Sequence, residues 1–97
     1  MIPSKKTVVV VEDDLRLQEH LIKILDKPED ITCLCAVSSA EEALEEVPAY
    51  RPDVVLMDIN LPGISGIDCI RDLKKRIPHL EVVMRSRHSP RDRARRW

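Results

Sequence analysis

Two short runs of aliphatic residues each end in acid, and this pattern limits what the chain can fold into. Residues 7–11 read Thr-Val-Val-Val-Val and lead into Glu12 and Asp13, while residues 54–57 read Val-Val-Leu-Met and lead into Asp58. Both runs have the length and composition of buried strands. Converging carboxylates repel one another, so a cluster of them persists only beside a cation or with a raised pKa. The pattern therefore predicts an acidic pocket that holds a hard divalent cation.

The composition favours one α/β domain. Apolar residues make up 43% of the 97-residue chain and aromatic residues only 2%, so the core must be aliphatic, as in buried parallel strands. We see neither an apolar run of about 18 residues, which would span a membrane, nor a signal peptide, and we expect a soluble protein. The cysteines Cys33, Cys35 and Cys69 fit a reducing cytoplasm, and the first two should share one face of a strand.

Strand and helix patterns alternate along the chain. Apolar residues at helical spacing predict a helix over 14–25 with Asp14 as its N-cap, and residues 31–37 read as a second strand. Ser39 and Glu42 form a capping-box pattern that begins a second helix, which Pro48 should end or kink.

The second half of the chain repeats this alternation. A third strand over 54–57 precedes a third helix over 67–77, and residues 80–84 read as a fourth strand. Alternating strands and helices predict a parallel sheet with helices on both faces. We expect a doubly wound sheet of the flavodoxin-like kind, whose known strand order is 2-1-3-4 over these four strands. Such sheets bind ligands beyond the carboxyl ends of their strands, here between the first and the third.

Two segments of the sequence resemble a known family. Residues 8–14 (VVVVEDD) and 52–66 (PDVVLMDINLPGISG) are similar to the receiver domain of two-component response regulators, most closely the kind found in DNA-binding transcriptional regulators. The likeness covers residues 7–84. It implies that Asp58 accepts a phosphoryl group from a phosphohistidine on a sensor histidine kinase. The chain would then act as a phosphoacceptor, and not as an enzyme beyond that transfer and its own dephosphorylation.

The resemblance also implies which residues bind the metal. Asp13 would ligate Mg²⁺ directly, Glu12 would act nearby through water, and the backbone carbonyl of Asn60 would add a ligand beside Asp58. Mg²⁺ prefers six oxygen ligands and keeps several waters, so a few protein groups suffice.

The chain departs from the family pattern after residue 84. Residues 1–84 carry ten Lys and Arg against sixteen Asp and Glu, whereas residues 85–97 carry six Arg against one Asp. We therefore divide the chain into a receiver-like domain, 1–84, and an Arg-rich tail, 85–97, whose composition suggests translation out of frame. Arg85 replaces an apolar strand residue, and Ser86 takes the position of the family's phosphate-sensing hydroxyl.

The tail shows no fifth strand, no Lys-Pro and no last helix of the family. We expect phosphoryl transfer to be impaired without that Lys, and the open sheet edge at 80–84 to form a homo-oligomer.

Other functions remain possible on the sequence alone. The chain could be an interaction module that keeps the receiver scaffold without phosphorylation. The Arg-rich tail could attract nucleic acid, although Trp97 is its only stacking residue, and we expect no such partner. A hydrolase of the haloacid-dehalogenase type also uses an aspartyl phosphate, but its motif requires Asp where this chain has Asn60.

Overall fold

The computed structural model describes residues 6–58, 61 and 65–85. Four strands and three helices alternate in this part of the chain: β1 (Lys6–Val11), α1 (Leu15–Asp26), β2 (Ile31–Val37), α2 (Ala40–Tyr50), β3 (Val54–Asp58), α3 (Gly66–Arg76) and β4 (Glu81–Arg85). Arg85 is thus the last residue of a strand. The rest of the predicted tail lies outside the described residues, so the domain boundary at residue 84 stays a prediction.

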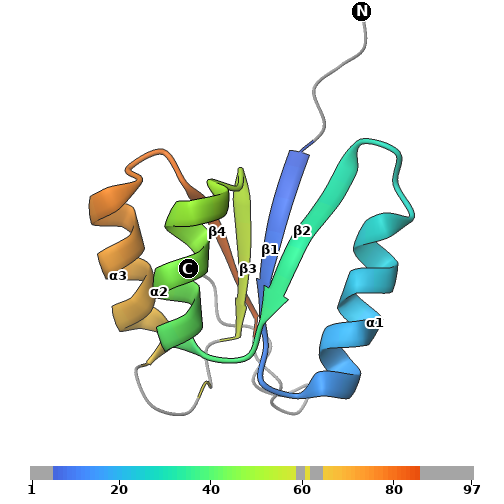
Figure 1. Cartoon of the computed structure of the whole chain (residues 1–97), viewed down its shortest axis with the longest axis horizontal. Helices are drawn as coiled ribbons and strands as arrows, with labels where there is room; N and C mark the ends of the chain where they lie inside the picture. Colours follow the sequence, from blue (N-terminus) through green and yellow to red (C-terminus); the bar gives the residue numbers. More distant parts are fainter. Residues whose placement is uncertain (1–5, 59–60, 62–64, 86–97) are drawn as a thin grey trace, which may run out of the picture.

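The four strands form one parallel sheet in the order β2-β1-β3-β4, which confirms the predicted flavodoxin-like order. Figure 1 shows α1 on one face of the sheet and α2 and α3 on the other. All four strands end at the same edge of the sheet, because they are parallel. Residues that follow β1 and β3 therefore meet at that edge.

The main core lies between the sheet and the pair α2 and α3. Alternate residues of the two central strands, such as Val9 and Val55, are fully buried there. Their partners from the helices include Ala43, Val47 and Leu73. Aliphatic side chains fill this core, as the composition predicted.

The opposite face of the sheet is covered less completely. Helix α1 contains no fully buried residue, and its Ile24 is 46% exposed. A groove of about 420 Å³ runs along this face past β3 and β4, with Val8, Leu56 and Val83 among its lining residues. Helix α1 packs mainly against β1 and β2, so β3 and β4 keep apolar surface on this side.

Helix α2 continues past its proline. Ser39 caps its start, accepting a hydrogen bond from the Glu42 N–H at 3.1 Å, as predicted. Of the two predicted alternatives, that Pro48 ends the helix or that it kinks it, the first is wrong, because the helix extends to Tyr50. Arg51 ends it in the left-handed conformation, with a φ of 49°, and its N–H donates to the Val47 carbonyl.

A bulge in β2 changes the expected placement of two cysteines. Val8 pairs with Cys33, but the next residue, Val9, pairs with Cys35, so Leu34 is the extra residue. Neighbouring residues of β1 point to opposite faces, and their partners follow them. The prediction that Cys33 and Cys35 share a face is therefore wrong. Only Cys35 packs against the main core.

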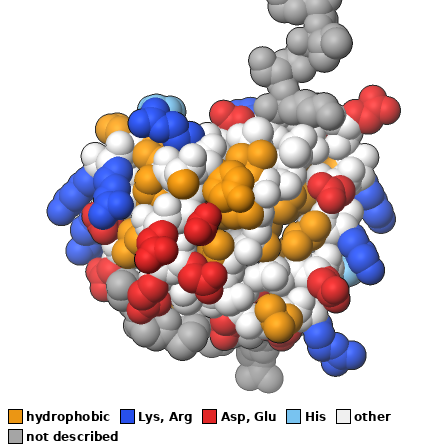
Figure 2. Space-filling view, in the orientation of Figure 1, with side chains coloured by type: hydrophobic (Ala, Val, Ile, Leu, Met, Phe, Trp, Pro, Cys, Tyr) orange, Lys and Arg blue, Asp and Glu red, His pale blue; other side chains and the backbone are white. Residues whose placement is uncertain are grey.

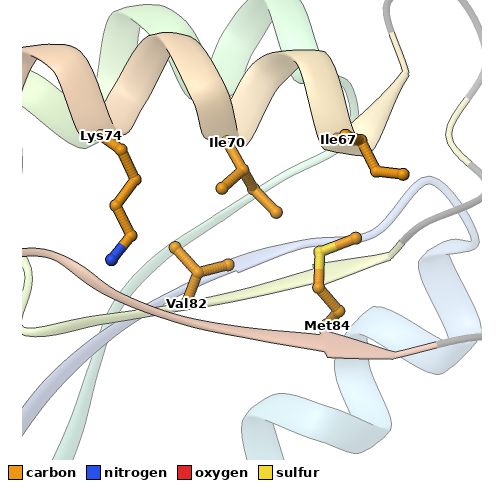
Figure 3. Close-up of a pocket in the computed structure, with 5 residues that line it drawn as sticks. All are labelled: Ile67, Ile70, Lys74, Val82 and Met84. Carbon is orange, nitrogen blue, oxygen red and sulfur yellow. The ribbon is translucent and has the colours of Figure 1, made fainter. Parts of the chain in front are cut away.

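The surface over the second and third helices is charged, with an apolar groove beside it. Figure 2 shows acidic side chains over α2, where Glu41, Glu42 and Glu45 are exposed. A groove of about 300 Å³ separates α3 from β4 (Figure 3). It is lined by Ile67, Ile70, Lys74, Val82 and Met84. None of the helices described here is long and apolar enough to cross a membrane.

Candidate functional site

Three carboxylates meet at the carboxyl edge of the sheet. Glu12 and Asp13 follow β1, and Asp58 is the last residue of β3, the strand beside it. One carboxylate oxygen from each of the three lies within 4.8 Å of the others. Glu12 and Asp58 are completely buried, whereas Asp13 is half-buried. The structure thus brings together the three acids that the sequence singled out.

The Glu12 backbone is fixed between the first two strands. Its N–H donates to the Val37 carbonyl at 3.0 Å, which continues the β1–β2 ladder by one residue. The side-chain amide of Gln18, from α1, donates both to the Glu12 carbonyl at 3.0 Å and to the Val37 carbonyl at 3.1 Å. These bonds hold the turn after β1 against β2. Gln18 is a positioning residue that sequence reasoning missed.

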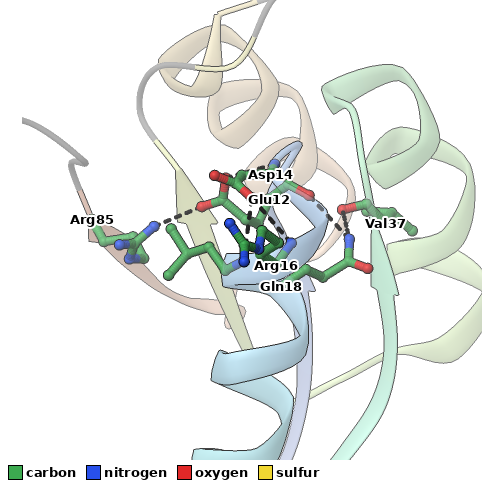
Figure 4. Close-up of polar contacts among 7 residues, drawn as sticks. Glu12, Asp14, Arg16, Gln18, Val37 and Arg85 are labelled. Atoms are coloured by element: carbon green, nitrogen blue, oxygen red, sulfur yellow. Dashed lines mark hydrogen bonds and ion pairs between the residues drawn. The ribbon is translucent and has the colours of Figure 1, made fainter.

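The turn into α1 fixes the Glu12 side chain as well. The Asp14 N–H donates to Glu12 Oε2 at 3.0 Å. Asp14 itself caps the helix, accepting hydrogen bonds from the N–H groups of Arg16 and Leu17, as predicted. Figure 4 shows these contacts around the end of β1. One carboxylate oxygen of Glu12, Oε2, is therefore held by the backbone, which leaves Oε1 as the oxygen without that bond.

That other oxygen binds a guanidinium group. Arg85 Nη1 lies 2.6 Å from Glu12 Oε1, and the Arg85 side chain is 25% exposed while the Glu12 side chain is wholly buried. Arg85 ends β4 in register with Asp58. Because neighbouring strands lie about 4.8 Å apart, the Arg85 side chain must cross the end of β3 to reach Glu12. The Arg85–Glu12 contact therefore passes the end of β3, the strand whose last residue is Asp58 (Figure 4).

Sequence reasoning missed Arg85 as a member of this pocket. The interpretation of Arg85 rested on its place in a strand position that is apolar in the family. The useful signal was its position at the end of a parallel strand, since every such end shares the edge that carries Glu12 and Asp58. Asn60 and Ser86, the other predicted site residues, lie outside the described residues.

The acidic cluster fits a magnesium ion in its chemistry. All three side chains offer carboxylate oxygens, the ligand type that Mg²⁺ prefers. Their separation of at most 4.8 Å is close to the distance of about 4 Å between opposite ligands of an octahedral Mg²⁺. Oδ1 of Asp13 and Oδ2 of Asp58 are buried, so a bound ion would be partly shielded from solvent. These residues can therefore hold a hard divalent cation.

A doubly wound parallel sheet with a carboxylate cluster at its switch point defines an α/β domain with a candidate cation site at the carboxyl edge. The family model for the response regulator receiver domain matches residues 8–97 of this chain. The chain therefore belongs to the receiver domain family of two-component response regulators.

Curated proteins and solved structures agree with this assignment. The transcriptional regulatory protein DegU of Brevibacillus brevis is 34% identical over 85 residues, which cover 88% of this chain and 36% of DegU. The two-component response regulator PhoP of Pseudomonas aeruginosa is 42% identical over 67 residues, or 69% of this chain and 29% of PhoP. The chain thus spans about a third of the length of these relatives.

The fold is shared with solved receiver domains. The crystal structure of the response regulator domain of Thermotoga maritima CheB superposes with a TM-score of 0.81 at 28% sequence identity. The matched region covers 93% of this chain and 66% of that chain.

Proposed function

We propose that Asp58 accepts a phosphoryl group from a phosphohistidine on a sensor histidine kinase. The observation that carries this proposal is the meeting of Glu12, Asp13 and Asp58 at one buried edge, in a member of the receiver family. A carboxylate is a competent phosphoryl acceptor where positive charge balances the transferred group. Asp58 is the member of the cluster that stands on the strand end, at the centre of the edge.

The reaction exchanges one bond for another. A carboxylate oxygen of Asp58 forms a bond to phosphorus, the phosphorus–nitrogen bond of the phosphohistidine breaks, and the imidazole nitrogen keeps the electron pair. Mg²⁺ would be held by Glu12, Asp13, Asp58 and the Asn60 carbonyl, and its charge would balance the phosphoryl oxygens. The burial of Asp58 limits the access of water to the acyl phosphate. Ser86 would contact the phosphoryl group.

A second candidate is an interaction module that works without phosphorylation. The ion pair between Arg85 and Glu12 supports it, because a guanidinium already balances one acid of the pocket. Such a module would keep the receiver scaffold and its surfaces but would take no phosphoryl group. In either case we propose a cytoplasmic protein whose partner is a histidine kinase or another signalling protein, with no nucleic acid bound.

We also propose that the chain forms a homo-oligomer through β4. Among the described strands, β4 pairs only with β3, so within the described residues its other side has no backbone partner. Val83 on this strand is 45% exposed, and the groove beside Val82 and Met84 adds apolar surface. A second copy could add its own edge to this strand.

Phosphoryl labelling separates the two candidate functions. The full chain is incubated with acetyl phosphate and Mg²⁺, trapped with borohydride, and mapped by mass spectrometry. We expect modification at Asp58, none in Asp58→Ala, and wild-type labelling in Asp26→Asn, a control on the exposed end of α1. Label that persists in Asp58→Ala would contradict the phosphoacceptor role. A folded, Mg²⁺-binding chain that takes no label would favour the interaction module.

A further inference from the structure

We propose that Arg85 competes with Mg²⁺ for the Glu12 carboxylate, and that this competition sets the metal affinity of the pocket. This inference rests on the proposed metal site, and it names Arg85 as the residue that regulates metal binding there. It starts from one contact, the 2.6 Å ion pair between Arg85 Nη1 and Glu12 Oε1. The pocket thus contains a cation supplied by the chain itself.

The guanidinium and the metal need the same space. The ligand oxygens of Glu12, Asp13 and Asp58 all lie within 4.8 Å of one another, so an ion held by all three lies a few ångströms from Glu12. The guanidinium is in direct contact with that carboxylate. The Asp14 N–H donates to Oε2 at 3.0 Å and Arg85 contacts the other oxygen, Oε1, so a metal must share the Glu12 carboxylate with these groups or displace one of them. Of the two groups, Arg85 is the one that carries positive charge, so it is the competitor for a cation at Glu12.

Electrostatics makes the two cations exclude each other. A divalent ion and a guanidinium at neighbouring sites repel strongly where solvent screening is reduced, as beside the buried Glu12 and Asp58. One of the two cations must leave or move away.

The burial of the two partners shows which one moves. Glu12 is wholly buried, and its backbone is tied to Val37 and Gln18. Arg85 is 25% exposed at the end of an edge strand, so its side chain can turn toward solvent without unpacking the core. Metal binding should therefore displace the guanidinium from Glu12. The coupling is reciprocal, so Mg²⁺ loosens the Arg85 contact by the same factor as Arg85 weakens Mg²⁺ binding.

This competition gives the pocket two charge-balanced states. Without metal, Arg85 links the end of β4 to the end of β1 across β3. With metal, Glu12 faces the ion and the end of β4 is released. Metal occupancy is thereby coupled to the edge strand of the sheet.

The test is a calorimetric Mg²⁺ titration of the full chain at constant ionic strength. We expect Arg85→Gln to bind Mg²⁺ about tenfold more tightly than wild type, the lower end of what a charge-assisted hydrogen bond contributes. Arg85→Lys should remain close to wild type, because it keeps the charge. Lys6→Gln removes one positive charge at the opposite end of the sheet, where Lys6 pairs with Glu81, and should leave the affinity unchanged.

Two results are distinguished by this design. If Mg²⁺ binds to no variant, or binds equally to Asp13→Asn and wild type, the proposed metal site itself fails. If binding depends on Asp13 but Arg85→Gln is no tighter than Lys6→Gln, the metal site stands and the competition is overturned. Should Arg85→Gln not fold, the Arg85 side-chain NMR signals of wild type decide instead. They should shift on saturation with Mg²⁺, and unchanged signals would overturn the proposal.

Discussion

The guanidinium of Arg76 donates a hydrogen bond to the carbonyl oxygen of Leu44, 3.4 Å away on the neighbouring helix. Leu44 stands four residues before Pro48, which has no N–H to give to that carbonyl. An arginine from the end of α3 thus takes the place of the missing helical donor in α2. This contact links the two helices that cover the main core, and it helps to explain why α2 continues beyond its proline.

We expect Arg76→Met to lower the free energy of unfolding by about 0.5–1.5 kcal/mol, as for the loss of one hydrogen bond. In the Pro48→Ala background, the new backbone N–H can donate to the Leu44 carbonyl. Arg76→Met should therefore lower the free energy of unfolding by less in that background. Urea unfolding of the four proteins in this cycle measures the coupling. Asp72→Asn controls for the 3.8 Å ion pair of Arg76 with Asp72. Equal costs in both backgrounds would contradict the link.

Local patterns predicted the elements, while contacts between distant residues produced the exceptions. Helix caps at Asp14 and Ser39 depend on residues within three positions, so the sequence contained them in full. The continuation of α2 past Pro48 involves a hydrogen bond from Arg76, 28 residues further on. Helical periodicity cannot predict a donor from so distant a residue. The bulge at Leu34 likewise is a register shift between β1 and β2, two strands that are separated in the sequence by α1.

The candidate site shows the same division. The acids could be predicted because strand ends in a parallel sheet share one edge, which fixes Glu12 and Asp58 as neighbours. Arg85 escaped prediction, because its long side chain reaches across β3 to an acid 73 positions earlier. The periodicity of the sequence predicts strands and their order, but it does not predict which distant residue a long side chain contacts.

If the pocket binds Mg²⁺, the ion should raise the stability of the folded protein. We expect Mg²⁺ at about 100 times its dissociation constant to raise the free energy of unfolding of wild type by about 2.7 kcal/mol, since it binds the folded state. Asp13→Asn removes a proposed ligand without removing the burial of its neighbours, and it should lose this gain. Thermal melts with and without Mg²⁺, with Glu19→Gln as a charge control on α1, measure the effect. A full gain in Asp13→Asn would exclude Asp13 as a ligand.

The opposite edge of the sheet carries an acid that makes stability depend on pH. Asp53 Oδ2 accepts hydrogen bonds from the Thr7 N–H at 2.8 Å and from its hydroxyl at 3.1 Å, and these bonds lower the pKa of Asp53. A lowered folded-state pKa contributes stability above the unfolded value of about 3.9. That contribution is lost as pH falls through the folded value.

We therefore expect Asp53→Asn to be less stable than wild type near neutral pH, and this difference to shrink in acid. Denaturant unfolding of both proteins between about pH 7 and pH 3 measures it. Glu19→Gln serves as the control for a removed carboxyl. A difference that is constant over the whole range would show that the Thr7 bonds favour neither protonation state.

The three thiols should differ in reactivity. Cys69 is completely buried, and burial raises its pKa to about 11, with Asp72 and Glu41 adding to the shift. Burial also raises the pKa of Cys33 and Cys35, which are only half-buried. At about pH 8, a disulfide reagent should label Cys33 and Cys35 slowly and Cys69 only after unfolding. Mass spectrometry after timed quenching locates the labels, and early labelling of Cys69 would contradict its burial.

The exposed edge of β4 should allow two copies of the chain to associate. Dimers that persist at low concentration bury about 1,200 Å² or more, so the backbone edge needs help from apolar side chains. Val83 provides exposed apolar surface on one face of β4, and Val82 and Met84 provide it on the other face, beside α3. A charge placed in the middle of this strand should oppose pairing, because two copies would bring like charges together without a partner.

Light scattering at tens of micromolar should therefore find a dimer or larger species for wild type and a shift toward monomer for Val83→Asp. Ile24→Asp is the matched control, since Ile24 on α1 is 46% exposed against 45% for Val83, and it should assemble like wild type. Both changes put the same charge in place of an exposed aliphatic side chain, so only the location differs. A monomeric wild type would exclude this interface, and equal dissociation by the two variants would show that charge rather than the sheet edge controls assembly.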